Sequence, residues 1–157
     1  MKKVAIFLAV ILVALGTTTF LFSGEGESPE NGESDYSEPE EVEIDENLIG
    51  DWQWVETIYN DGREVRPDGD DFVLTFNENG SMSSTTDCNG LSGQFNLREG
   101  NEISFSEIAM TKMYCEDSLE DEYLRTFNDA STYLFEDDNL VITIKYDSGS
   151  TIFEPVE

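Results

Sequence analysis

Apolar and polar residues alternate in short segments from residue 48 to the end of the chain. In residues 71–77, Phe72, Leu74 and Phe76 recur at every second position, which is the pattern of a strand with one buried face. Gly, Asn and Asp separate the segments, as expected for tight turns. The pattern predicts strands over residues 48–59, 71–77, 81–86, 91–97, 102–106, 133–135, 140–146 and 151–153.

One segment follows helical spacing instead. Leu119, Tyr123, Phe127 and Ala130 form an apolar stripe, which predicts an amphipathic helix over residues 118–130 with Ser118 as its N-cap. The order of elements is strands, one helix, then strands, with short connections. This order predicts a mainly β fold with one helix (α+β), in which the helix packs on a curved antiparallel sheet or open β-barrel.

The N-terminal residues 1–22 have the pattern of an export signal, with two lysines before a largely apolar run. The run over residues 4–22 is long enough to span a bilayer as a helix, and the bulky residues 20–22 crowd the position where signals are cleaved. We therefore favour an uncleaved membrane anchor over a cleaved signal. Either predicts export: the domain faces the outside or periplasm on the membrane, or is secreted after cleavage.

Residues 23–46 contain eleven acidic residues and no basic one, among Ser, Gly, Pro and Asn. Such a segment buries too little apolar surface to fold, so we expect a disordered tether, with a binding tail for a basic partner as the alternative. The remaining residues, 47–157, suffice for one domain with one core.

The charge of the chain limits its partners and its chemistry. Acidic residues number 35 against 8 basic ones, and the part from residue 48 onward has 24 against 6, which argues against binding of nucleic acid or anionic lipid. The chain contains no histidine, the commonest general base and transition-metal ligand. We predict no catalytic residue, no metal and no cofactor. Paired carboxylates acting as a hydrolase, and acidic turns at 68–71 and 136–139 holding cations weakly, are the alternatives.

The chain has two cysteines, Cys88 and Cys115. In an exported domain they predict a disulfide, which would close a loop of 28 residues and stabilise the fold by roughly 3.5 kcal/mol. Two buried free thiols are one alternative, and a redox or metal-binding pair is another, although no Cys-x-x-Cys spacing supports it.

Four residues near the cysteines or on the first strand are candidate contacts for a ligand or partner. Asn89 lies beside Gly90 and suits a turn. Lys112 is a rare cation in an acidic domain, and we expect it to form a salt bridge. Trp52 and Trp54 share one strand face and belong either to the core or to a sugar-stacking platform.

These motifs resemble the META domain, typified by HslJ-like, heat-inducible envelope lipoproteins of bacteria. The resemblance covers residues 48–154 and rests on Leu48, Gly50, Trp52, Phe72, Leu74, Phe76, Gly80, Cys88, Asn89, Gly93, Phe95, Ala109, Met110, Thr111, Lys112, Met113, Cys115, Glu122, Leu140 and Phe153. The family usually carries glycine where this chain has Asp87, so the resemblance implies a strained backbone there. This chain also lacks the lipid-bearing cysteine of many members.

The resemblance implies a small β-barrel-like fold with a helix and no established catalytic activity. Members have been connected with stress tolerance and drug resistance, and the fold is similar to that of pilotins that chaperone secretins, which is a likeness of fold only. We therefore expect a non-enzymatic, exported, membrane-tethered protein with a structural, interaction or stress-protective role in the cell envelope, and an envelope protein as partner. A carrier of a small apolar ligand in a barrel cavity is the first alternative, and a hydrolase the second. The oligomeric state stays open.

Overall fold

The structure, a computed structural model, describes residues 43–156. The expected signal or anchor over residues 1–22 and most of the expected tether over 23–46 lie outside the described residues. Within 43–156, no helix is both long and apolar enough to cross a membrane. The expected tether overlaps the described part at residues 43–46, where Ile44 packs against the core and Glu46 begins a short 3-10 helix, Glu46–Leu48.

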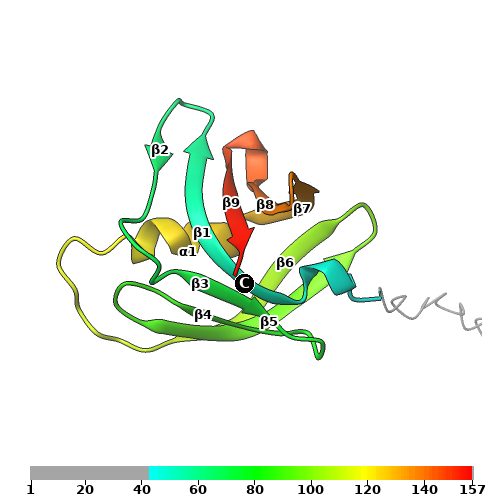
Figure 1. Cartoon of the computed structure of the whole chain (residues 1–157), viewed down its shortest axis with the longest axis horizontal. Coiled ribbons are helices and arrows are strands. Elements are labelled where there is room, and N and C mark those ends of the chain that lie inside the picture. Colours follow the sequence, from blue (N-terminus) through cyan, green and yellow to red (C-terminus); the bar gives the residue numbers. More distant parts are fainter. Residues whose placement is uncertain (1–42, 157) are drawn as a thin grey trace, which may run out of the picture. The chain divides into compact units, whose positions relative to one another are not determined.

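Eight antiparallel strands close into a barrel, and a ninth short strand extends it. β1 pairs with β3 on one edge and with β9 on the other, which closes the barrel, while β2 pairs with the far end of β1 (Figure 1). The mainly β fold with one helix is confirmed. The strands are β1 (Gly50–Tyr59), β2 (Glu64–Val65), β3 (Val73–Phe76), β4 (Ser81–Thr85), β5 (Gly90–Arg98), β6 (Glu102–Met110), β7 (Ala130–Glu136), β8 (Asn139–Ile144) and β9 (Gly149–Pro155).

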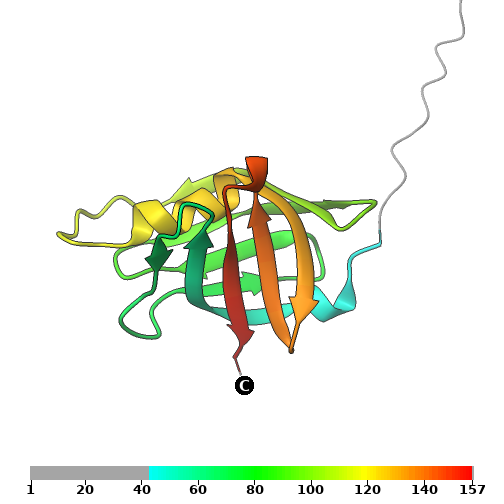
Figure 2. The same cartoon turned by 90° about the horizontal axis from the view of Figure 1, so that it is seen from above.

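The seam between β6 and β7 is the weakest part of the barrel. The two strands share one register pair, Glu102 with Thr132, and Tyr133 donates its amide to the carbonyl of Asn101 at 2.9 Å. The helix α1 (Glu120–Asn128) lies in the connection between these strands and packs against β6, β7 and β8 (Figure 2). The helix therefore supplies at this seam the packing that the sparse strand pairing does not.

The predicted stripe of the helix enters the core. The Tyr123 ring lies 5.2 Å from that of Trp54 and 5.1 Å from that of Phe72, between centroids, and Phe127 stacks edge-on against Phe105 at 5.1 Å. The pairs of Tyr123 with Phe72 and of Phe127 with Phe105 are edge-to-face, and such pairs add to the stabilisation from buried area. Aromatic side chains of the helix and of the sheet thus fill the part of the interior around Tyr123.

Polar groups in the interior also have partners. Thr151 hydrogen-bonds Thr57 at 3.0 Å and Thr126 at 2.7 Å, and the Trp54 indole donates to Thr57 at 3.1 Å. Burial raises the pKa of Tyr123, whose hydroxyl hydrogen-bonds Ser84 at 2.8 Å. Within residues 43–156, every buried side-chain nitrogen or oxygen has a hydrogen-bond partner. Buried polar groups that all have hydrogen-bond partners are typical of a packed core.

Several boundaries differ from those that the pattern predicts. β6 runs on to Met110, beyond the predicted end at residue 106. The alternation stops there because a bulge interrupts it: β5 and β6 shift register between Ser92 and Gln94, and Glu107 has a φ of 54°. β7 begins at Ala130 rather than 133, and the helix is shorter than predicted at both ends. β2 has only two residues, too few for a periodic pattern.

Gly93 lies opposite this bulge, where two strands approach closely. A Cβ added there would lie 2.9 Å from the carbonyl oxygen of Ser106, whereas a Cβ at Gly90 would meet nothing nearer than 3.8 Å. We therefore expect Gly93→Ala to lower the free energy of unfolding by about 1–3 kcal/mol, and Gly90→Ala in the same strand to change it far less. Urea unfolding followed by tryptophan fluorescence measures both, and equal losses would contradict the close approach.

Candidate functional site

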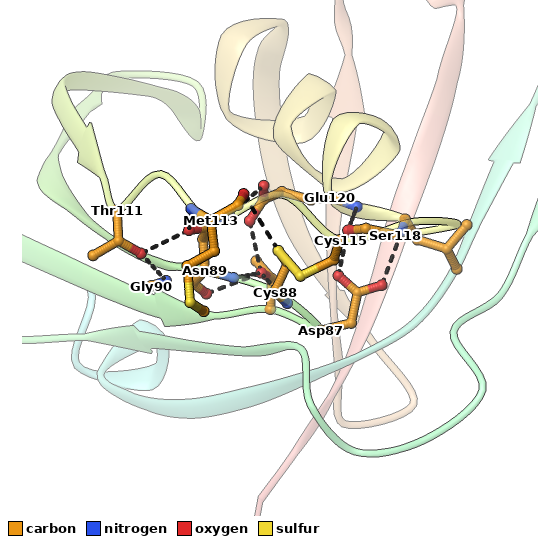
Figure 3. The surroundings of a disulfide bond; sticks show 11 residues. Asp87, Cys88, Asn89, Gly90, Thr111, Met113, Cys115, Ser118 and Glu120 are labelled. Atoms are coloured by element: carbon orange, nitrogen blue, oxygen red, sulfur yellow. Dashed lines mark hydrogen bonds between the residues drawn. A yellow bond between two sulfur atoms is a disulfide. The ribbon is translucent and has the colours of Figure 1, made fainter.

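A disulfide joins Cys88, in the turn between β4 and β5, to Cys115, in the segment between β6 and α1 (Figure 3). The two Cα atoms lie 5.9 Å apart, an ordinary separation for a disulfide. The predicted disulfide is confirmed. It ties two segments that are 27 residues apart in the chain.

Asn89 reinforces this link. Its side-chain oxygen accepts hydrogen bonds from the Thr111 hydroxyl and the Met113 amide, both at 2.8 Å, and its side-chain nitrogen donates to the Met113 carbonyl at 3.2 Å and to Glu120 at 2.9 Å. The side chain is buried. All four bonds go to protein groups, so Asn89 holds the segment after β6 in place and has no capacity left for a ligand.

Asp87 does not have the strained backbone that the family's glycine implies. Its φ is not in the left-handed region, because the Thr86 hydroxyl accepts the amides of Cys88 and Asn89 and supports an ordinary turn. The Asp87 carboxylate instead accepts the Leu119 amide at 2.9 Å and the Ser118 hydroxyl at 2.5 Å.

The start of α1 is therefore capped from outside the helix. Ser118, the predicted N-cap, does accept the Glu120 amide at 3.1 Å, but the neighbouring Leu119 amide is held by Asp87. A carboxylate near free amides at a helix N-terminus is stabilised by hydrogen bonding and by the helix dipole. Sequence reasoning missed this role because Asp87 is 32 residues from Leu119.

The other candidate contacts do not join this site. Trp52 and Trp54 are buried, and the indole of Trp52 donates to the Leu48 carbonyl at 2.9 Å, so these two residues do not form an exposed stacking platform. Lys112 is exposed and forms no ion pair with any carboxylate among residues 43–156. The prediction that it forms a salt bridge is therefore wrong within that range.

Two apolar side chains next to Lys112 are highly exposed. Met113 has 65% and Tyr114 has 92% of its surface accessible, although the Met113 backbone is bound by Asn89. We call residues 112–114 the tip. Sequence reasoning identified Met113 as a motif position and overlooked Tyr114, because nothing in the local pattern distinguishes an exposed aromatic residue from a buried one.

A second polar cluster lies where α1 meets the β1–β2 hairpin. The Glu122 carboxylate accepts the Tyr59 hydroxyl at 2.8 Å and the Arg63 guanidinium at 2.9 Å, and Arg125 lies 3.7 Å away. Burial acts to raise the pKa of Glu122, but the hydrogen bonds from Tyr59 and Arg63 outweigh it and lower that pKa. Burial, together with the hydrogen bond to Glu122, raises the pKa of Tyr59. This cluster ties the helix to the barrel.

Four acidic side chains of the described residues gather at one surface cleft but form no metal-binding group. In the described part of the chain, no group of three or more Asp, Glu, Cys or His side chains is placed to hold a metal ion. A surface cleft of about 300 Å³ is lined by Asp68, Asp71, Asp87 and Asp117 together with Arg66. Both oxygens of Asp87 are already occupied by the helix start.

The sequence matches the META domain over residues 46–154. The chain belongs to the META domain family. The disulfide joins two segments, Cys88-Asn89 and Thr111-x-Met113-x-Cys115, and both belong to the motifs that resemble the META domain. We call them the stapled segments. In this META domain they form a structural link, and the hairpin turn and the helix start are its two sides.

Two solved structures share the fold of this META domain. A protein from Burkholderia xenovorans, solved by NMR, is 18% identical with a TM-score of 0.57, covering 69% of this chain and 83% of that one. A DUF4847 family protein from Bacteroides vulgatus is 15% identical with a TM-score of 0.53, covering 68% of this chain and 92% of that one. At these identities the likeness shows the fold alone. No curated protein matches the sequence.

The cap from Asp87 makes a first prediction for this site. With the disulfide intact, Asp87→Ala should lower the free energy of unfolding by about 1–2 kcal/mol, because two donors at the helix start lose their acceptor. Asp87→Asn keeps one acceptor oxygen and should lose less. Thermal unfolding by circular dichroism measures both. Asp68→Ala, in an exposed turn of the same cleft, is the control, and a loss there equal to that of Asp87→Ala would contradict the cap.

Glu122 should make stability depend on pH. Its folded-state pKa lies below its unfolded value, so its contribution is present above about pH 4.5 and is lost as the pH falls through the folded-state pKa. Glu122→Gln should therefore reduce the free energy of unfolding by about 1 kcal/mol at pH 7 and by much less near pH 3. Urea unfolding across this range checks it, with the exposed Glu136→Gln as control. A loss of unfolding free energy in Glu122→Gln that does not change with pH would contradict this role of Glu122.

Proposed function

We propose that this META domain is a non-catalytic interaction module, exported and held at the membrane by residues 1–22 through the acidic tether 23–46. The single observation that supports it best is the filled barrel. Side chains of the sheet and of α1 occupy the interior, and within residues 43–156 its buried polar side-chain atoms have partners. A protein with this interior acts through its outer surface.

The disulfide supports the exported location. Disulfides persist in oxidising compartments outside the cytoplasm, and Cys88–Cys115 links segments that would otherwise depend on hydrogen bonds alone. The strongly acidic surface supports a soluble domain that repels anionic lipid and is held at the membrane by its tether. A stress-protective role in the cell envelope is the form of this function that the family resemblance suggests.

The carrier alternative would need a cleft at the surface of the barrel, and the rim has one that is bordered by two aromatic residues. A cleft of about 590 Å³ there is bordered by Trp52 and Phe135, whose rings lie 5.8 Å apart, and by Asn47, Asp137 and Asp138. An apolar ligand prefers a pocket that is mostly apolar and encloses it. A rim cleft with two carboxylates meets this requirement poorly, which is why we place the function on protein contacts.

The location is directly testable in a bacterial host. The full chain with a C-terminal tag should sediment with membranes, resist extraction by salt, dissolve in detergent, and be digested by protease added outside spheroplasts. Deletion of residues 1–22 should leave it inside, with Cys88 and Cys115 as free thiols by mass spectrometry. Full-length protein in the cytosol with both thiols free would contradict the proposal. Release of the processed domain would support the cleaved-signal alternative.

A further inference from the structure

The tip, residues 112–114, combines exposure with a rigid backbone. Met113 and Tyr114 are 65% and 92% exposed, while the disulfide at Cys115 and the hydrogen bonds of Asn89 to the Met113 amide and carbonyl hold the backbone on both sides. Most large apolar side chains of this domain lie in its core. Two adjacent exposed ones on a stapled segment therefore call for an explanation beyond folding.

A rigid exposed tyrosine and methionine suit a protein interface. Tyr and Met are enriched at the centres of interfaces, and Tyr is a frequent binding hot spot. A backbone held in place before binding lowers the entropy that is lost when the contact forms. The disulfide and Asn89 thus have a second consequence besides stability, because they present the tip in a fixed conformation.

The charges around the tip indicate the chemistry of a partner. Glu116 and Asp117 are exposed and follow Cys115 directly, and Asp87 and Asp121 are exposed beside the start of α1. Lys112 is the one basic residue in the tip itself. Complementary charges speed and orient association, so a partner here would surround its apolar pocket with basic residues. The same acids disfavour an anionic membrane surface.

The loop that carries the tip lies at the other end of the domain from the point where the described chain begins (Figures 1 and 2). The described chain enters at residue 43 at one end of the domain, whereas the loop between β6 and α1 projects at the other end in both views (Figures 1 and 2). A contact at this loop leaves the entry point of the tether free.

We propose that the tip is the docking element for an envelope protein that receives Met113 and Tyr114 in an apolar pocket rimmed by Lys and Arg. This inference rests on the proposed function and names its contact surface. The disulfide and Asn89 present the tip and do not themselves touch the partner.

Photo-crosslinking in cells tests the contact with the full chain. A photoreactive amino acid in place of Tyr114 should give a discrete adduct with one envelope protein, identified by mass spectrometry. Tyr146, which is 95% exposed between β8 and β9, and Leu134, exposed on β7, are the control positions. Adducts at the controls with none at position 114 would overturn the tip while leaving an interaction function intact. Adducts at position 114 to phospholipid alone would overturn it in favour of a lipid surface.

Affinity measurements with the identified protein decide whether the contact is specific. The double variant M113S/Y114S of the full chain in detergent should bind it about tenfold or more weakly, whereas Tyr146→Ser should not differ from the unmodified chain. Binding should weaken as salt is raised, because basic and acidic groups meet at the rim. Equal binding by M113S/Y114S, or binding insensitive to salt, would refute the proposal.

The Cys88–Cys115 disulfide allows a further test of whether a fixed backbone at the tip strengthens binding. C88S/C115S keeps every tip side chain, yet it should bind about fivefold more weakly because the tip must be ordered on binding. Circular dichroism establishes first that this variant is folded at the temperature used. If it is not, Asn89→Ala in the disulfide-bonded chain replaces it, with the same expected direction. If a folded variant without the disulfide binds like the unmodified chain, the disulfide does not serve to hold the tip in its binding conformation.

Discussion

The contact on which this fold depends is the insertion of the helix stripe into the barrel at Tyr123. The β6–β7 seam has one register pair, so strand hydrogen bonds alone close it weakly. The Tyr123 ring packs against Trp54, Phe72 and Phe127, and its hydroxyl reaches Ser84 on β4. A single side chain thereby joins the helix to the opposite wall of the barrel. Burial raises its pKa, so it stays neutral and remains compatible with an apolar core.

Two polar clusters fix the helix around that contact. At its start, Asp87 and the disulfide connect it to the β4–β5 turn; one turn further, Glu122 connects it to Tyr59 and Arg63 at the β1–β2 hairpin. The helix is short, and helices of this length are marginal in isolation, so tertiary contacts supply most of its stability. The same contacts fill the interior around Tyr123 with side chains of the protein itself.

The motif segments of the META domain have a structural explanation here. Asn89 and Cys88 face Met113 and Cys115 across a gap that is closed by one covalent bond and by side-chain to backbone hydrogen bonds. What these bonds leave exposed is the tip. The motif residues Cys88, Asn89 and Cys115 thus hold this segment together, and the proposed contact lies on its outer side.

The sequence alone predicted the mainly β fold, the buried face of the strand with Phe72, Leu74 and Phe76, the apolar stripe of the helix and the disulfide. Period-two and helical spacing are local signals, and two cysteines behind an export-signal pattern favour a disulfide. It also indicated the family. Tertiary structure decided the closure of the barrel by β1 and β9, the capping role of Asp87, the burial of Trp52 and the exposure of Tyr114. These depend on which distant segments meet, and the spacing of residues along a chain carries little information about that.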